Sequence, residues 1–209
     1  MKVLVIGAGG KSGRLVVEKA LAVGHEVVAL VHSAESEEKH PMPAGAEVFH
    51  GDVRNPSKLE AAMAGCQGVV DAIGGTKPFL ETTMERDAAK VVLEVMGKVG
   101  AKRLVVISVM GVGESRESAG WFYDHLLLPV FLRGALPDKT AMEDEVKHSD
   151  VDWVLVRPPV LKDSDETGVV RVLGQGELAE SITRGDLARF LVEQLTSEEF
   201  VGRAVTVAN

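Results

Sequence analysis

The chain has 209 residues, of which 45% are hydrophobic and 26% charged, as is ordinary for a globular domain. Its 23 Lys and Arg against 31 Asp and Glu give a net charge of −8, which argues against a nucleic-acid partner. The most apolar stretch, residues 126–132, is too short to cross a bilayer, and the N-terminus does not read as a signal peptide. We therefore expect a cytoplasmic protein with no membrane partner.

The length fits one α/β domain over residues 1–209, with no interdomain linker. Cys66 is the single cysteine, which excludes an internal disulfide and a cysteine-built metal site. We predict no metal site.

The first fifteen residues predict a strand, a glycine turn and a helix. Residues 3–6 form an apolar run typical of a strand buried on both faces, and helical spacing follows from Leu15. Between them, glycines allow a tight turn, close approach of backbone to a pyrophosphate, and close helix packing. The helix N-terminus also attracts phosphate. The predicted pyrophosphate-binding residues are Gly7, Gly10, Lys11, Ser12 and Gly13.

Other interpretations of this loop fit less well. The pattern G-x-G-x-x-G from Gly7 needs glycine at position 12, where the chain has Ser12. A Walker A loop ending at Gly10-Lys11-Ser12 would need its first glycine at Val5, inside the strand. A glycine turn without a ligand remains the simple alternative, but the position at a strand–helix junction favours a dinucleotide.

A second strand, residues 25–31, ends at His32 and Ser33, where such a domain chooses its cofactor. An acid there binds the ribose of NAD, whereas a basic group accommodates the 2′-phosphate of NADP. Imidazole and hydroxyl groups can both donate to a phosphate, so we favour NADP and keep NAD possible. The alternative is a solvated loop, as we read residues 35–40, whose acids argue mildly against NADP.

After a third strand, residues 46–50, Asp52 and Val53 are predicted to border the adenine. Asp52 can accept a hydrogen bond from the adenine amino group, or it can cap the helix that begins near Pro56. A fourth strand, residues 68–73, ends in further glycines.

The backbone of Gly74 and Gly75 is predicted to pass close to the second ribose. After a helix over residues 82–99, a fifth strand, residues 103–108, ends at Ser108. In such sheets ligands bind beside the point where the strand order reverses, so Ser108 is a candidate catalytic residue. The alternative is that a serine at a strand end only satisfies backbone hydrogen-bonding groups.

A set of residues spread along the chain forms a recognisable pattern: Gly7, Gly10, Gly13, Gly51, Asp52, Ser108, Lys139, Glu143, Arg157 and Pro158. With these residues the chain resembles the atypical short-chain dehydrogenase/reductases, and within them the NAD(P)H-binding, NmrA-like branch that includes the flavin reductase/biliverdin reductase B type. The resemblance covers essentially the whole chain, but many relatives carry a basic residue, usually arginine, where His32 stands.

Residues 111–137 are predicted to cover the pocket. Aromatic side chains there suit a flat conjugated substrate, although a helix packed on the sheet edge or on a second subunit explains them equally well. Monomer and homodimer therefore both stay open. The predicted substrate-binding residues are Met110, Trp121, Tyr123 and Phe131.

The usual Tyr-x-x-x-Lys pair is absent, because Tyr123 is followed four residues later by Leu127 and Lys139 is preceded by Ala135. Carbonyl reduction needs an acid for the oxygen, whereas a reduced flavin or quinone spreads its charge and takes a proton from solvent. The resemblance implies that Lys139 holds the nicotinamide ribose. The alternative is an exposed lysine at the start of a helix over residues 137–148, with Asp138 as its cap.

Beyond a sixth strand, residues 151–156, the prolines turn the chain over the pocket. In relatives this backbone contacts the nicotinamide carboxamide, which gives Pro158 and Val160 as cofactor-binding residues. A last helix begins near Thr183 or Asp186, and residues 204–207 form a closing edge strand.

These elements predict a Rossmann-type, doubly wound parallel sheet of order near 3-2-1-4-5-6-7. The function that we predict is an NAD(P)H-dependent reductase acting on a flat conjugated acceptor such as a flavin or quinone. The alternative is a non-catalytic NAD(P)-binding sensor of NmrA-like type.

Overall fold

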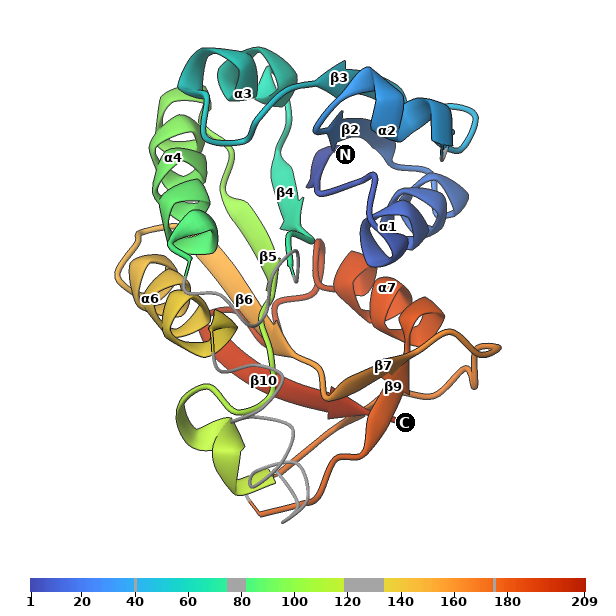
Figure 1. Cartoon of the computed structure of the whole chain (residues 1–209), viewed down its shortest axis with the longest axis vertical. Coiled ribbons are helices and arrows are strands. Elements are labelled where there is room, and N and C mark those ends of the chain that lie inside the picture. Colours follow the sequence, from blue (N-terminus) through green and yellow to red (C-terminus); the bar gives the residue numbers. More distant parts are fainter. Residues whose placement is uncertain (40, 75–81, 119–133, 175) are drawn as a thin grey trace.

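Strands and helices alternate along most of the chain in the computed structural model, which describes residues 1–39, 41–74, 82–118, 134–174 and 176–209. Helices cover both faces of a central sheet (Figure 1). The strands are β1 (Lys2–Ile6), β2 (Glu26–Val31), β3 (Glu47–His50), β4 (Gly68–Asp71), β5 (Arg103–Ile107), β6 (Asp152–Arg157), β7 (Val160–Lys162), β8 (Arg171–Val172), β9 (Ser181–Thr183) and β10 (Arg203–Ala208).

The main sheet has the order β3-β2-β1-β4-β5-β6-β10-β8, and all its strands are parallel except β8. With β10 as the seventh strand, the predicted order is confirmed. The prediction of β10 as the edge was wrong, because β8 pairs with it antiparallel through Val207 and Val172. Strands β7 and β9 form a separate parallel pair.

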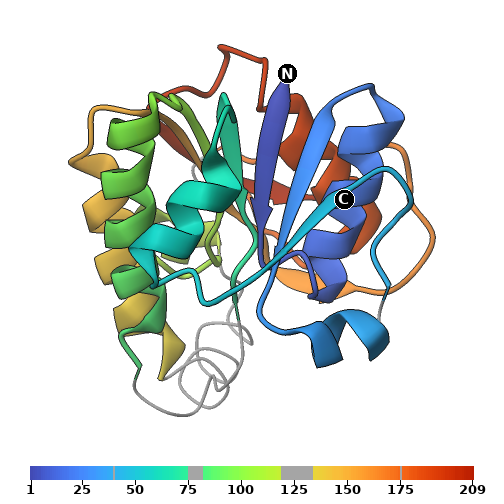
Figure 2. The ribbon, with the colours of Figure 1, turned by 90° about the horizontal axis from the view of Figure 1, so that it is seen from above.

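Two layers of helices enclose the sheet, with α1 and α7 on one side and α3, α4 and α6 on the other (Figure 2). No helix among the described residues is long and apolar enough to cross a membrane. The helices are α1 (Lys11–Ala22), α2 (Ala34–Lys39), α3 (Pro56–Met63), α4 (Met84–Val99), α6 (Ala135–Lys147), α7 (Arg184–Glu193) and the 3-10 helix η1 (Gly113–Ser118).

Two hydrophobic cores lie on opposite faces of the sheet, and alternate side chains along each strand contribute to one or the other. Val3 and Val5 of β1 pack with α1 and α7, whereas Leu4 and Ile6 pack with α3 and α4. All four are essentially inaccessible to solvent. Because successive side chains of a strand point to opposite faces, a strand covered on both sides must be apolar throughout.

Local details differ from the prediction in two places. Residues 34–39 form the short helix α2, where we expected a solvated loop. Helix α6 begins at Ala135, so Asp138 lies inside its first turn and does not cap it. Instead, the carboxylate of Asp138 accepts hydrogen bonds from the backbone N–H groups of Glu85 and Arg86, at 3.1 and 3.0 Å. It thus caps the first turn of the neighbouring helix α4.

Candidate functional site

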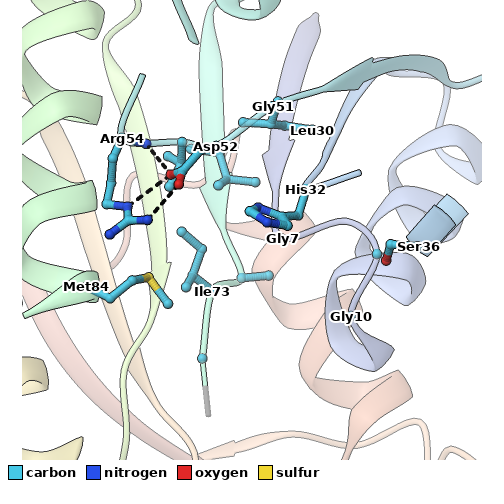
Figure 3. A pocket seen from close by; sticks show the side chains of 15 residues that line it. Gly7, Gly10, Leu30, His32, Ser36, Gly51, Asp52, Arg54, Ile73 and Met84 are labelled. Atoms are coloured by element: carbon cyan, nitrogen blue, oxygen red, sulfur yellow. Dashed lines mark hydrogen bonds and ion pairs between the residues drawn. The ribbon is translucent and has the colours of Figure 1, made fainter. Parts of the chain in front are cut away.

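A pocket of about 420 Å³ lies at the carboxyl ends of the first four strands (Figure 3). Strand β1 pairs with β2 on one side and β4 on the other, so the connections diverge from it and leave a crevice. The residues that line the pocket are Ile6, Gly7, Gly9, Gly10, Leu30, His32, Ser36, Gly51, Asp52, Val53, Arg54, Ala72, Ile73, Gly74 and Met84.

Two glycines of the first loop are required by the backbone itself. Gly7 has φ +73°, and a Cβ there would lie 2.9 Å from the carbonyl oxygen of Ala72. A Cβ on Gly13 would lie only 2.2 Å from the carbonyl oxygen of Gly7, so α1 packs directly on the turn. The tight turn and the close helix packing predicted for these glycines are therefore present.

Gly10 occupies the position between them and precedes α1 as its N-cap. Gly10 has no side chain with which to cap this helix end, and it is exposed. A Cβ at Gly10 would have one near neighbour, the carbonyl oxygen of Gly7 at 3.3 Å. The start of α1 therefore offers its N–H groups and the positive end of its dipole to an anion.

Charged side chains flank the start of α1. The Nζ of Lys11 lies 2.5 Å from Asp163, and the Nε of Arg184 lies 2.6 Å from the same carboxylate. Arg184 also donates to the hydroxyl of Ser12 at 3.1 Å. Hydrogen bonds from Lys11 and then Arg184 hold the pKa of Asp163 below its usual value. Lys11 and Ser12 thus lie beside the glycine turn, outside the pocket lining.

The side chains of Asp52 and Arg54 form a bidentate ion pair at the end of the pocket opposite the glycine turn (Figure 3). The guanidinium of Arg54 donates to both oxygens of Asp52, at 3.0 and 2.6 Å, and these bonds lower the pKa of Asp52 to about 2. The helix-cap alternative for Asp52 was wrong, because Asn55 caps α3 by accepting from the N–H of Lys58 at 3.1 Å. Asp52 is an ionised acceptor at the pocket wall.

The end of β2 contributes the exposed ring of His32, which lies between Asp52 and the glycine turn in Figure 3. Ser33 lies outside the lining, and its hydroxyl oxygen accepts the N–H of Ser36 at 3.3 Å. The hydroxyl hydrogen of Ser33 is not used in that bond. An imidazole and a hydroxyl group thus adjoin the pocket where the sequence predicts the cofactor choice.

Buried charges lie beneath the end of β4. Asp71 is 6% exposed, and its carboxylate accepts the N–H of Ile73 at 2.9 Å. Burial raises the pKa of Asp71 to about 6, against the opposing effects of that hydrogen bond and of Lys139. Burial likewise raises the pKa of Glu85, although its ion pair with Lys139 opposes the shift.

Lys139 is buried, so its interpretation as an exposed lysine was wrong. Its ammonium group donates to the carbonyl oxygens of Ile107 and Ile73, at 2.9 and 3.4 Å, and pairs with Glu85. An ammonium group has three donors, and three acceptors surround this one. Lys139 therefore ties the ends of β4 and β5 to α4.

Ser108 is also buried, at the end of β5, and its hydroxyl donates to Glu143 at 2.6 Å. The same carboxylate receives Arg157 through Nε at 2.8 Å and Nη2 at 2.6 Å, and Lys147 at 2.9 Å. Burial raises the pKa of Glu143, but the hydrogen bonds outweigh it and leave that pKa below its usual value. Glu143 is therefore an anion.

The pocket lining includes neither Ser108 nor Lys139, and it also leaves out Met110 and Val160. Met110 is fully buried beside Ala179 and Ala208, and its N–H donates to the carbonyl oxygen of Pro158 at 3.0 Å. Val160 is 43% exposed on β7. Their assignments stay predictions. The predicted residues that lie outside the described ranges are Gly75, Trp121, Tyr123 and Phe131.

Sequence reasoning missed several wall residues, including Arg54, Met84 and Ser36. The sequence did contain a signal for Arg54, because this residue follows Asp52 by two positions. At that spacing an arginine in a loop can fold back and pair with the acid. Met84 begins α4, and Ser36 lies in a helix that we expected to be loop. Nothing in the local pattern placed these two at the pocket.

The pocket residues fit the dinucleotide that the sequence predicts. The uncapped N–H groups near Gly10 suit a pyrophosphate, and the ionised Asp52 suits the adenine amino group. The cavity lies at the crossover point of the sheet where such ligands bind.

Comparisons with known proteins agree with this geometry. A family model described as NAD(P)H-binding matches residues 7–198. The UPF0659 protein YMR090W of Saccharomyces cerevisiae is 28% identical over 205 residues, which cover 93% of this chain and 87% of the yeast protein.

Solved structures match the whole chain. One, from Bacillus halodurans and assigned to the NAD-dependent epimerases/dehydratases, is 28% identical with a TM-score of 0.81 and is covered over 94% of its length. ChuY, an anaerobilin reductase of Escherichia coli O157:H7, is 24% identical, also with a TM-score of 0.81, and is covered over 97%. The second likeness concerns the fold alone.

Replacing Gly10 by valine should abolish dinucleotide binding without unfolding the chain. The backbone angles at Gly10, φ −79° and ψ 162°, are open to valine, but the branched side chain would occupy the approach to the helix N-terminus. Fluorescence titration with NADPH measures binding, and circular dichroism checks folding. Gly97→Val is the control, since that glycine faces open space in α4. Undiminished NADPH binding by folded Gly10→Val would show that the pyrophosphate does not bind at the start of α1.

Asp71→Asn should stabilise the protein at neutral and alkaline pH. The folded pKa of Asp71 lies above its unfolded value, so the free energy of unfolding falls as pH rises from about 4 to 6, by up to about 3 kcal/mol. Asparagine keeps an acceptor for the N–H of Ile73 and removes the charge. Thermal unfolding should show a higher Tm for Asp71→Asn at pH 8, with a smaller gain at pH 5. The exposed Asp144→Asn is the control; an equal gain at both pH values contradicts the prediction.

Proposed function

The chain belongs to the NAD(P)H-binding family, and we propose that it is an oxidoreductase that reduces a flat conjugated acceptor, such as a flavin or quinone, with NAD(P)H. The observation that carries the proposal is the pocket formed by the glycine turn and the carboxyl ends of β1 to β4. The fold shared with ChuY, which is a reductase, supports this direction.

Bound NAD(P)H would supply the hydride, which is one proton with two electrons, and would be left as NAD(P)+. The backbone near Gly10 would hold the pyrophosphate, and Asp52 would accept from the adenine amino group. These contacts would hold the dinucleotide in one orientation, and the ends of β4 and β5 would then be the part of the site that meets its reactive ring.

The missing Tyr-x-x-x-Lys pair supports a conjugated acceptor. The only tyrosine of the chain, Tyr123, has Leu127 at the fourth following position. A conjugated ring that accepts hydride spreads the negative charge over several atoms, and water can deliver the balancing proton. A simple carbonyl would need a positioned acid at its oxygen instead.

Ser108 and Lys139 are the residues that we assign to the nicotinamide side. Lys139 holds the carbonyl oxygens of Ile73 and Ile107, so it shapes the wall between β4 and β5. Contact with the nicotinamide ribose would require Lys139 to exchange one of these partners. Ser108 would orient the nicotinamide or the acceptor by a hydrogen bond.

Purified protein should oxidise NADPH when given FMN, riboflavin or a quinone, as followed by the loss of absorbance at 340 nm. Ser108→Ala should lower turnover about tenfold to a hundredfold, or about 1.4–2.7 kcal/mol in the barrier, because an orienting contact is lost and no proton donor is. Turnover that is unchanged or abolished in folded Ser108→Ala would contradict that role. No oxidation across flavins, quinones and small aldehydes would favour the non-catalytic sensor.

NADPH should bind more tightly than NADH at low salt, because the imidazole of His32 and the hydroxyl of Ser33 can donate to a 2′-phosphate. His32→Ala should reduce the preference, while binding of NADH should stay within about twofold. Parallel fluorescence titrations of both cofactors measure this. Equal affinities in the parent protein, or a preference for NADH, reject the assignment.

A further inference from the structure

We infer that Glu143 is a positioning residue that makes Ser108 a hydrogen-bond acceptor toward the substrate, so that the site selects conjugated acceptors carrying a ring N–H. This rests on the proposed function, because it describes how the same site chooses among flat acceptors. The argument starts from the hydrogen bonds around one buried carboxylate.

The carboxylate of Glu143 has no exposed surface and receives four donors. Ser108 and the Nε of Arg157 donate to Oε1, while Nη2 of Arg157 and Lys147 donate to Oε2. An ionised carboxylate has no hydrogen of its own to give. The 2.6 Å contact therefore requires the hydroxyl hydrogen of Ser108 to point at Glu143.

The orientation of this network is fixed from the far side as well. Arg157 is 1% exposed and cannot lose its charge in a protein, and its Nη1 donates to Glu114 at 2.7 Å. The guanidinium thus holds both oxygens of Glu143 in place. With its hydrogen committed, Ser108 can offer a ligand only its lone pairs.

A lone pair pairs with an N–H or O–H group and repels another acceptor. Flavins in the oxidised state carry one ring N–H, at N3, whereas quinones present only carbonyl oxygens. A buried acceptor left without a partner costs affinity, so the contact discriminates between these classes. The inference therefore favours an N–H-bearing acceptor over a quinone.

The test uses lumiflavin and 3-methyllumiflavin, which differ at N3, with the protein saturated by NADP+. Titration of flavin fluorescence should give an affinity at least about tenfold higher for lumiflavin in the parent protein. Ser108→Ala should bring the ratio of the two affinities close to one. Glu114→Gln is the matched control, because it makes the same chemical change at the other end of Arg157, and it should keep the parent ratio.

Glu143→Gln separates hydrogen bonding from a simple steric clash with the methyl group. The amide oxygen is favoured at the Oε2 position, because two cationic groups donate there, Nη2 of Arg157 and Lys147, against one at Oε1, Nε of Arg157. The amide NH2 then faces Ser108, and the serine hydrogen is free to point outward. The ratio should then fall although Ser108 stays in place. If this variant does not fold, the Ser108→Ala ratio decides the matter alone.

Three results would overturn the inference. They are a ratio of the two flavin affinities near one in the parent protein, an unchanged ratio in folded Glu143→Gln, and binding of neither flavin. Oxidation of NADPH by the quinone menadione is measured beside these titrations. Quinone reduction without flavin selectivity leaves the proposed function standing and removes the inference. Selective flavin binding without turnover of any acceptor does the reverse.

Discussion

A close approach between α1 and the end of β1 is the constraint on which the rest of the site depends. The Cα of Gly13 faces the carbonyl oxygen of Gly7 so closely that a methyl group would lie 2.2 Å from it. This contact aims the start of α1 at the crevice between the diverging connections of β1. Both the anion-binding helix end and the cavity wall follow from that one packing distance.

The sheet and the glycine turn could be predicted because both depend on local pattern. Apolar runs identified the central parallel strands of the main sheet, and glycine spacing identified the junction after β1. The parallel pair β7 and β9 was not predicted. The antiparallel strand β8 was not predicted, because its two exposed residues, Arg171 and Val172, are too few to show a hydrophobic period. Its position depends on pairing with β10, a long-range contact.

Side-chain partners were the least predictable part of the site. The sequence identified Ser108 and Asp52 by their places at strand ends, and Lys139 through the family resemblance. It did not identify the side chains within the protein that each would contact. The partner of Ser108, Glu143, is 35 residues away, and that of Lys139, Glu85, is 54 residues away. Only the packing of α4 and α6 on one face of the sheet brings these groups together.

The two edges of the main sheet have a consequence for self-association. At one edge, β3 has four residues that begin with exposed Glu47 and end with exposed His50. Glu47 is ion-paired with Lys2, and His50 is hydrogen-bonded to Glu37. At the other edge, β8 has two residues. Short or charged edges offer few free backbone groups to a second chain. Continuation of the main sheet from one copy into another is therefore disfavoured at both of its described edges.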